Sequence, residues 1–415
     1  MWWRKAARSA AVVVVVLCVG GGAGAEAVPL EDLLTRPVVR DPATAMPTPL
    51  GDSFYQPPPG FEDTAPGTVL ASRVGGIGLT LTPVTSTELL IRSTDSKDRP
   101  VAVVATLLVP QAPWPGPGPR PVVAFNVAID SLGHTCAPSY QLRSGPSADL
   151  MAAQIPLAKN YAVLVTDHQG PRQAYAAGRM AGHAVLDSLR GAVGHPELGL
   201  RPDSPAVVTG YSGGAIASGW AAQLAPDYAP ELELVGAVFG GVPADFELLL
   251  HTMNGRNAAA GVFLAAALGV AREYPDMMWM FNDNGWRLAQ NFKNLCFPGE
   301  AALGAVMPVP AELLTDAPDP LADPVVQRML ADNRMGATAP RVPVYLYHGT
   351  HELWIPLEGA QRLYDDWCAH GVQVQFDVYP GEHIVAGALA IPEANAWIDR
   401  MLAGNGPNDC AKSWR

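Results

Sequence analysis

The pentapeptide 210–214, Gly-Tyr-Ser-Gly-Gly, constrains this chain more than any other segment. The run 206–209 before it predicts a short buried strand, and the alanine-rich run 215–222 after it predicts a helix. A serine between glycines at a strand-to-helix junction is typical of a nucleophile elbow, a turn so tight that its flanking positions must lack a side chain. Such a turn exposes the Ser212 hydroxyl and leaves the next backbone N–H to stabilise an oxyanion. The pattern alone is a weak signal, so its context must support it.

Residues 1–25 are predicted to be a secretory signal peptide, because a cationic start precedes an apolar core and a small-residue cleavage site at 23–25. The apolar core is too short for a comfortable membrane span. Cys18 suggests lipid attachment as an alternative, but Leu17 is large where a lipid-attachment signal has a small residue. We therefore expect a secreted, extracellular and soluble protein.

Acidic residues outnumber basic ones by 39 to 27, which gives a formal net charge of −12. This balance argues against nucleic acid or an anionic membrane as a partner. An even number of cysteines follows the signal peptide, and in an oxidising compartment this favours two disulfides. The cysteines are Cys136, Cys296, Cys368 and Cys410. Their spacing leaves all three possible pairings open.

Apolar runs alternate with helical patterns along most of the chain, which predicts an α/β fold with a mostly parallel sheet covered on both faces. The predicted strands are 101–109, 122–126, 161–166, 206–209, 234–239, 342–348 and 372–379. The predicted helices of this core are 176–192, 215–222, 357–370 and 384–402. Segment 26–66 is rich in proline and is predicted to be an extended arm on the surface. The core then consists of residues 26–242 and 340–415.

Residues 243–339 form an insertion between the two parts of the core, predicted to be helical and unusually apolar. It contains a nearly all-apolar helix at 258–271 and the cluster Met277–Phe281. One interpretation is a buried core helix. The other is a cap or lid whose inner face contacts an apolar substrate.

A serine nucleophile needs a base, and the base needs an acid that orients it. Among the five histidines after the elbow (His251, His348, His351, His370 and His383), His383 lies in the loop directly after the last predicted strand. This is where a catalytic base is expected when the order along the chain is serine, acid, histidine. We therefore predict that His383 is the base.

Glu352 is the only carboxylate in loop 349–356, which follows strand 342–348. Asp365 and Asp366 fall inside the next helix, and Glu358 is a weaker candidate. We predict that Glu352 is the acid. For the oxyanion hole, Gly213 is the natural first backbone donor, and Asp130 in the loop after strand 122–126 is predicted to supply the second. The histidines do not form a metal-binding motif, so neither a metal nor a cofactor is expected.

Several short motifs, in order along most of the chain, resemble the secretory lipase family of yeasts and actinobacteria, which includes the yeast lipase A type within the α/β-hydrolase superfamily. They are Asp52–Tyr55 with Pro66–Leu70, Cys136–Tyr140, Thr166–Gly170, Gly210–Gly214, and Tyr379–Pro380 followed by Glu382–His383. The resemblance implies an α/β-hydrolase fold with a helical lid at 243–339. It also implies Ser212 as nucleophile, His383 as base, Asp130 and Gly213 as the oxyanion hole, and the disulfides Cys136–Cys296 and Cys368–Cys410.

Members of that family hydrolyse carboxylic esters, often triacylglycerols, without a cofactor. Their acid is usually an aspartate at the position of Glu352, so this chain departs from the pattern with either a working substitute or a sign of weakened activity. We expect a secreted serine carboxylic-ester hydrolase, a triacylglycerol lipase or esterase that works through an acyl-enzyme. Its expected partner is a small lipid ester, with transient contact at a lipid interface, and the protein is expected to be a monomer. The alternatives are an acyltransferase or peptidase on the same fold, or a non-catalytic lipid-binding pseudo-hydrolase.

Overall fold

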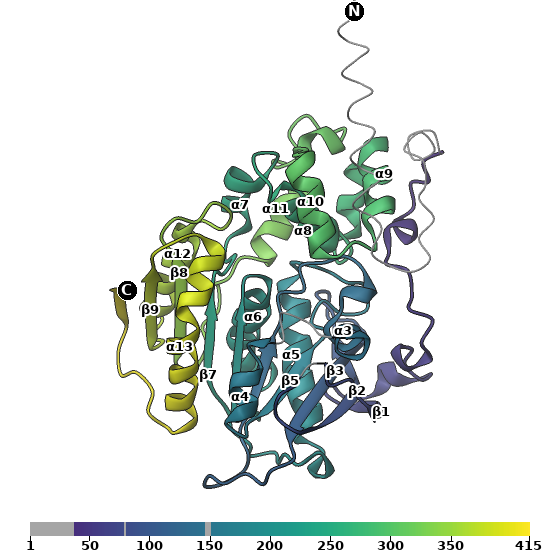
Figure 1. Cartoon of the computed structure of the whole chain (residues 1–415). Coiled ribbons are helices and arrows are strands. Elements are labelled where there is room, and N and C mark those ends of the chain that lie inside the picture. Colours follow the sequence, from purple (N-terminus) through teal and green to yellow (C-terminus); the bar gives the residue numbers. More distant parts are fainter. Residues whose placement is uncertain (1–36, 79, 146–150) are drawn as a thin grey trace, which may run out of the picture.

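A ten-stranded sheet organises the computed structural model, which describes residues 37–78, 80–145 and 151–415 (Figure 1). The predicted signal peptide lies outside the described residues. The strands are β1 (Val69–Val74), β2 (Val84–Thr94), β3 (Pro100–Pro110), β4 (Val122–Asn126), β5 (Ala162–Thr166), β6 (Ala206–Tyr211), β7 (Leu234–Gly240), β8 (Val344–Gly349), β9 (Val374–Tyr379) and β10 (Ala411–Trp414). Their order across the sheet is β1-β2-β3-β5-β4-β6-β7-β8-β9-β10.

Strands β4 to β10 pair in parallel, and β1, β2, β3 and β5 pair antiparallel at one side of the sheet. All of β5 and β8 is buried, as expected for parallel strands with helices on both faces. The α/β class predicted from the sequence is therefore confirmed.

The sequence analysis did not identify strands β1, β2 and β10. Strand β2 begins with the polar run Thr85–Glu88, and β10 is a largely exposed edge strand of four residues. The apolar run of β2 is only three residues long (Leu89–Ile91), and β10 has none. Each strand pairs with a neighbour, β2 with β3 over eleven residue pairs and β10 with β9, and the sequence pattern does not show this pairing. In the predicted arm, the described part starts at residue 37 and contains three short 3₁₀ turns.

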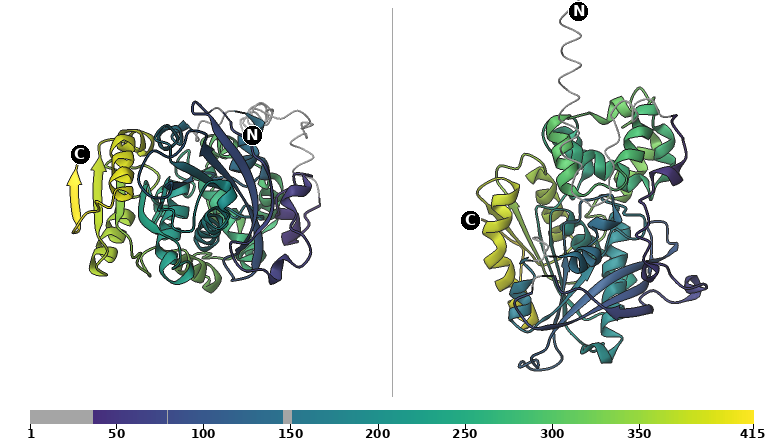
Figure 2. Two further views of the ribbon diagram at one scale, coloured as in Figure 1. Left: turned by 90° about the horizontal axis from the view of Figure 1, so that it is seen from below. Right: turned by 45° about the vertical axis from the view of Figure 1, so that its right-hand side comes forward.

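Helices cover both faces of the sheet (Figure 2). On one face lie α5 (Gly178–Val193), α6 (Gly213–Tyr228) and α12 (Leu357–Ala369), whose buried side chains share one apolar core with the sheet. On the other face lie α3 (Pro138–Ser144), α4 (Gln154–Ala158) and α13 (His383–Leu402). The cores beneath α13 and beneath α3 and α4 are separate clusters, so these helices do not form one continuous layer.

The helices of segment 243–339 lie beyond the carboxyl ends of the parallel strands, where loops position functional residues in open α/β sheets (Figure 1). They are α7 (Phe246–Met253), α8 (Ala260–Ala271), α9 (Asp283–Phe292), α10 (Phe297–Val306) and α11 (Pro324–Asp332). We call this group the cap. Most of α8 is buried, in line with its apolar composition.

Two disulfides join distant segments, and they are the pairs that the family resemblance implies. Cys136–Cys296 connects the loop after β4 to the cap, with 5.5 Å between Cα atoms. Cys368–Cys410 connects α12 to the segment that enters β10. Within the described ranges, no helix is both long and apolar enough to span a membrane.

Candidate active site

The elbow between β6 and α6 holds Ser212 in a conformation that few non-glycine residues adopt, with φ 55° and ψ −121°. The glycines on either side of Ser212 are needed because other backbone atoms lie where their side chains would be. A Cβ on Gly210 would lie 2.3 Å from the carbonyl oxygen of Gly214, and a Cβ on Gly214 would lie 2.0 Å from that of Asn126. The second contact also explains how the loop after β4 comes close to Ser212.

Asp130 lies in that loop with a left-handed backbone (φ 44°), directly beside the start of α6. A Cβ on Gly213 would meet the Asp130 carboxylate oxygen at 1.6 Å, so only glycine lets the loop pack this closely. Gly213 is the first residue of α6, and its N–H has no carbonyl partner within the helix. The structure therefore brings together the two backbone segments predicted to stabilise an oxyanion.

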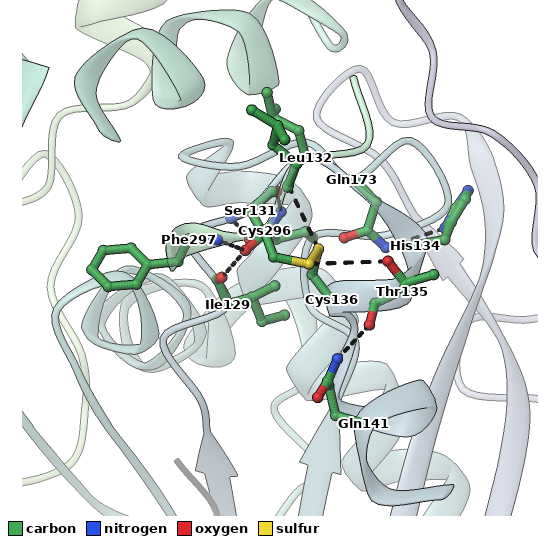
Figure 3. The surroundings of a disulfide bond; sticks show 12 residues. Ile129, Ser131, Leu132, His134, Thr135, Cys136, Gln141, Gln173, Cys296 and Phe297 are labelled. Carbon is green, nitrogen blue, oxygen red and sulfur yellow. Dashed lines mark hydrogen bonds between the residues drawn. A yellow bond between two sulfur atoms is a disulfide. The ribbon is translucent and has the colours of Figure 1, made fainter. Parts of the chain in front are cut away.

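Contacts with the cap hold the Asp130 loop in place (Figure 3). Ser131 Oγ accepts a hydrogen bond from the N–H of Phe297 at 2.9 Å and donates one to the carbonyl of Ile129 at 2.5 Å. The N–H of Leu132 donates to the carbonyl of Leu295 at 2.9 Å, next to the Cys136–Cys296 disulfide. The loop is thus attached to the cap by covalent and hydrogen bonds.

Two buried groups from other elements face Asp130. The Tyr175 hydroxyl hydrogen-bonds to its carboxylate, and burial, followed by the charges of Asp130 and Glu300, raises the pKa of Tyr175 well above its usual value. Burial, followed by the charge of Asp130, also raises the pKa of Glu300, which favours the neutral acid on α10. Neither residue was identified from the sequence, because each depends on contact between segments far apart in the chain.

Glu352 and His383 are in direct contact: Glu352 Oε1 lies 2.8 Å from His383 Nδ1. Two backbone hydrogen bonds hold their loops together, from Thr350 N–H to the Tyr379 carbonyl at 2.9 Å and from His351 N–H to the Gly381 carbonyl at 3.0 Å. The Glu352 side chain is 1% exposed, which strengthens its interaction with a neighbouring imidazole. Of the weaker candidates, Glu358 is exposed at the start of α12.

A second buried histidine lies behind this pair. His348 Nδ1 is 3.8 Å from the same Glu352 oxygen, and burial lowers the pKa of His348, which favours its neutral form. His348 therefore adds no competing positive charge to the contact between Glu352 and His383.

Two aromatic rings pack against the imidazole of His383. The Tyr211 ring centroid lies 4.9 Å from that of His383, and the Trp354 ring stacks at 5.8 Å. The Tyr211 hydroxyl donates a hydrogen bond to the His383 carbonyl at 2.5 Å. His383 Nε2 is buried and has no hydrogen-bond partner among the described residues, and the residues His383 and Ser212 both line one cavity. The imidazole is held at Nδ1, and its other nitrogen makes no hydrogen bond to the described residues.

Gly241, just after β7, leaves the space that the Tyr211 and His383 rings occupy. It has φ 55°, and a Cβ there would lie 2.7 Å from the Tyr211 ring and 2.8 Å from His383 Cε1. We expect Gly241→Ala to displace His383 and lower kcat for ester hydrolysis by about 10²-fold, since small misplacements of a reacting group have effects of this size. Steady-state kinetics checks this, with Gly371→Ala as control, because Gly371 also has a positive φ but no atom near its Cβ position. Equal losses in both variants would indicate general backbone strain instead of displacement of His383.

The cavity at Ser212 has a volume of about 860 Å³ and lies between the sheet, the cap and α13. An adjoining apolar chamber of about 140 Å³ extends into the cap between α7, α8 and α11. Tyr175, Pro243, Leu249, Phe263 and Ala266 line both spaces. Side chains of α8 therefore contribute both to the buried core and to the cavity wall. No cluster of three or more metal-ligating side chains occurs among the residues that the structure describes.

Comparison with known proteins agrees with this arrangement. A family model described as secretory lipase matches residues 144–409. The chain belongs to the secretory lipase family. It is 33% identical to a secreted triacylglycerol lipase of Malassezia restricta, over 86% of this chain and 80% of that protein. It is 32% identical to a probable inactive lipase of Mycobacterium tuberculosis, over 86% of this chain and 83% of that protein.

The crystal structure of Candida antarctica lipase A superposes on this secretory lipase with a TM-score of 0.82 at 27% identity, covering 89% of this chain and 90% of the other. The family and the fold that the resemblance implied are thus confirmed. This secretory lipase is an α/β-hydrolase and a carboxylic ester hydrolase. The roles of individual residues within it stay predictions.

Proposed function

We propose that the protein is a triacylglycerol lipase or esterase that acts through a Ser212–His383–Glu352 triad. The observation that carries the proposal is the 2.8 Å contact between Glu352 and His383 Nδ1, on a histidine that lines the same cavity as the elbow serine and whose Nε2 has no partner among the described residues. A carboxylate on Nδ1 fixes the tautomer in which Nε2 can accept a proton. That tautomer is the one that a base for Ser212 needs.

In this proposal His383 Nε2 takes the proton of Ser212 as Oγ attacks the ester carbonyl. The backbone N–H groups of Gly213 and Asp130 stabilise the tetrahedral oxyanion. The C–O bond then breaks, the alcohol leaves with the proton from His383, and the acyl group stays on Ser212. Water activated by His383 hydrolyses this acyl-enzyme and restores the serine. No cofactor takes part in these steps.

The substrate is proposed to be a lipid ester with a hydrocarbon acyl chain. The chamber within the cap is lined almost entirely by apolar side chains, and it shares Tyr175 and Phe263 with the wall of the cavity at Ser212. The family is secretory, and a secreted relative is among those matched, so we infer that the protein acts outside the cell.

A non-catalytic function is the second candidate, because one matched relative is named a probable inactive lipase and Glu352 stands where the family usually has aspartate. Hydrolysis of p-nitrophenyl esters from acetate to palmitate by the purified protein separates the two. We expect turnover, with higher kcat/KM for medium or long acyl chains than for acetate. A folded, disulfide-bonded protein without turnover at any chain length would favour the non-catalytic function.

A further inference from the structure

The cavity at Ser212 extends beyond the cap, along the length of α13. The α13 residues that line it recur every three or four positions, which places them on one face of the helix: Ile384, Ala388, Ile391, Asn395 and Ile398. With a rise of 1.5 Å per residue, this face runs ~22 Å from His383. We call this part of the cavity the α13 cleft.

The opposite wall and the floor of the α13 cleft come from the sheet and from α4. Ala152 and Pro156 line the cavity from the α4 side, and Val123 and Phe125 of β4 line it from the sheet. The cleft exists because α13 and α4 cover the same face of the sheet but pack over separate apolar clusters, with part of β4 between them.

An ion pair bridges α13 and the end of α4 near the last cleft residue. Lys159 Nζ lies 2.7 Å from Asp399 Oδ2, and the Tyr161 hydroxyl donates to Asp399 Oδ1 at 3.0 Å. Since Asp399 follows Ile398 directly, this bridge stands at the end of the cleft farthest from Ser212. Among the residues that the structure describes, Asp130 at the Ser212 end is the only acidic side chain that lines the cavity, and no lysine or arginine does.

The position of His383 determines which part of an ester enters the α13 cleft. When the tetrahedral intermediate collapses, the bond between the carbonyl carbon and the alcohol oxygen breaks, and that oxygen takes its electron pair and the proton from His383 Nε2. The alcohol oxygen must therefore lie against His383, which is the first residue of α13. The acyl side lies toward Tyr175, which contacts the oxyanion loop and lines the cap chamber.

We propose that the α13 cleft binds the alcohol side of the ester and accepts alcohols with a long hydrocarbon chain, which rests on the proposed function. In a glyceride, such a group is the glycerol with an acyl chain that is still attached. The substrate then occupies two binding regions: the acyl chain that is cleaved lies in the cap chamber, and the alcohol lies along α13.

Two isomeric esters test this assignment, because heptyl acetate carries its chain on the alcohol and methyl octanoate carries it on the acyl group. Ile391→Trp fills the cleft from its wall, since Ile391 is 39% exposed and lines the cavity. Leu389→Trp is the matched control, because Leu389 lies two positions away, is 48% exposed and is not part of the cavity lining. Ala388→Phe narrows the same cleft nearer to His383.

We expect Ile391→Trp and Ala388→Phe to lower kcat/KM for heptyl acetate by about 10-fold or more, the scale of losing a few methylene contacts. The same variants should change kcat/KM for methyl octanoate by less than about 2-fold, and Leu389→Trp should leave both esters unaffected. Equal losses for both esters, or a loss confined to methyl octanoate, would overturn the assignment of the cleft while hydrolysis itself continues. A parent protein that hydrolyses neither ester would contradict the proposed function instead.

Discussion

Replacing Ser212 with alanine is expected to lower kcat for ester hydrolysis by about 10⁵-fold, the range found when a serine nucleophile is removed from such a triad. The loss follows because the other hydroxyl of the elbow, that of Tyr211, donates to the His383 carbonyl and is a phenol instead of an aliphatic alcohol. The residual rate should come from binding and from the backbone donors alone. Hydrolysis of p-nitrophenyl butyrate measures the effect, because this small ester does not require a lipid interface.

The matched control is Ser218→Ala, six residues further along the chain and within α6. Ser218 is buried and hydrogen-bonds to Asn126 Nδ2 and to the Gly214 carbonyl, but it does not line the cavity. This variant tests whether a small change near the elbow is enough to stop catalysis. If Ser212→Ala retained a tenth or more of the parent activity, Ser212 would not be the nucleophile.

Replacing Glu352 with glutamine is expected to lower kcat by about 10³- to 10⁴-fold without unfolding the protein. Glutamine keeps the shape of the side chain but removes the negative charge, and its amide group can favour the wrong tautomer of His383. The interaction is sensitive to this change because the Glu352 side chain is almost completely buried and its Oε1 lies 2.8 Å from Nδ1. Kinetics with p-nitrophenyl butyrate, together with thermal unfolding, measures both effects.

Glu358→Gln is the control, because Glu358 lies six residues further along in an exposed position. Glu352→Asp tests the length of the acidic side chain, since it introduces the residue that the resemblance to the family implies at this position. The two loops here are joined so that the longer glutamate reaches His383, and we expect aspartate to lower kcat by roughly 10-fold through a lengthened contact. A parent rate unaffected by Glu352→Gln would mean that the acid lies elsewhere or that none operates.

The Glu352 variants also distinguish the two interpretations of a glutamate at this position, a working substitute for aspartate or a sign of weakened activity. A glutamate that is hydrogen-bonded, buried and needed for turnover is a working member of the triad. A glutamate that can be neutralised without effect would place this protein with the relative named a probable inactive lipase. The geometry favours the first outcome, because Glu352 already makes the contact that the reaction requires.

Local sequence patterns were enough to predict the elements that carry the site. Ser212, Glu352 and His383 each follow a strand with a strong apolar pattern, and the ends of parallel strands meet at one edge of a sheet. For this reason the α/β class and the three candidate residues could be named before any contact was known. The strands with polar or short sequences, β2 and β10, could not, because their formation depends on partner strands.

The sequence by itself thus determined the elbow, the order of the three candidate residues and the apolar character of the cap. The tertiary structure alone decided that Tyr211 and Trp354 enclose His383, that Ser131 and Leu132 attach the oxyanion loop to the cap, and that a cleft runs along α13. The physical reason is distance along the chain. Strand and helix patterns arise from neighbouring residues, whereas a cavity and its walls arise where segments from different parts of the chain pack together or leave a space between them.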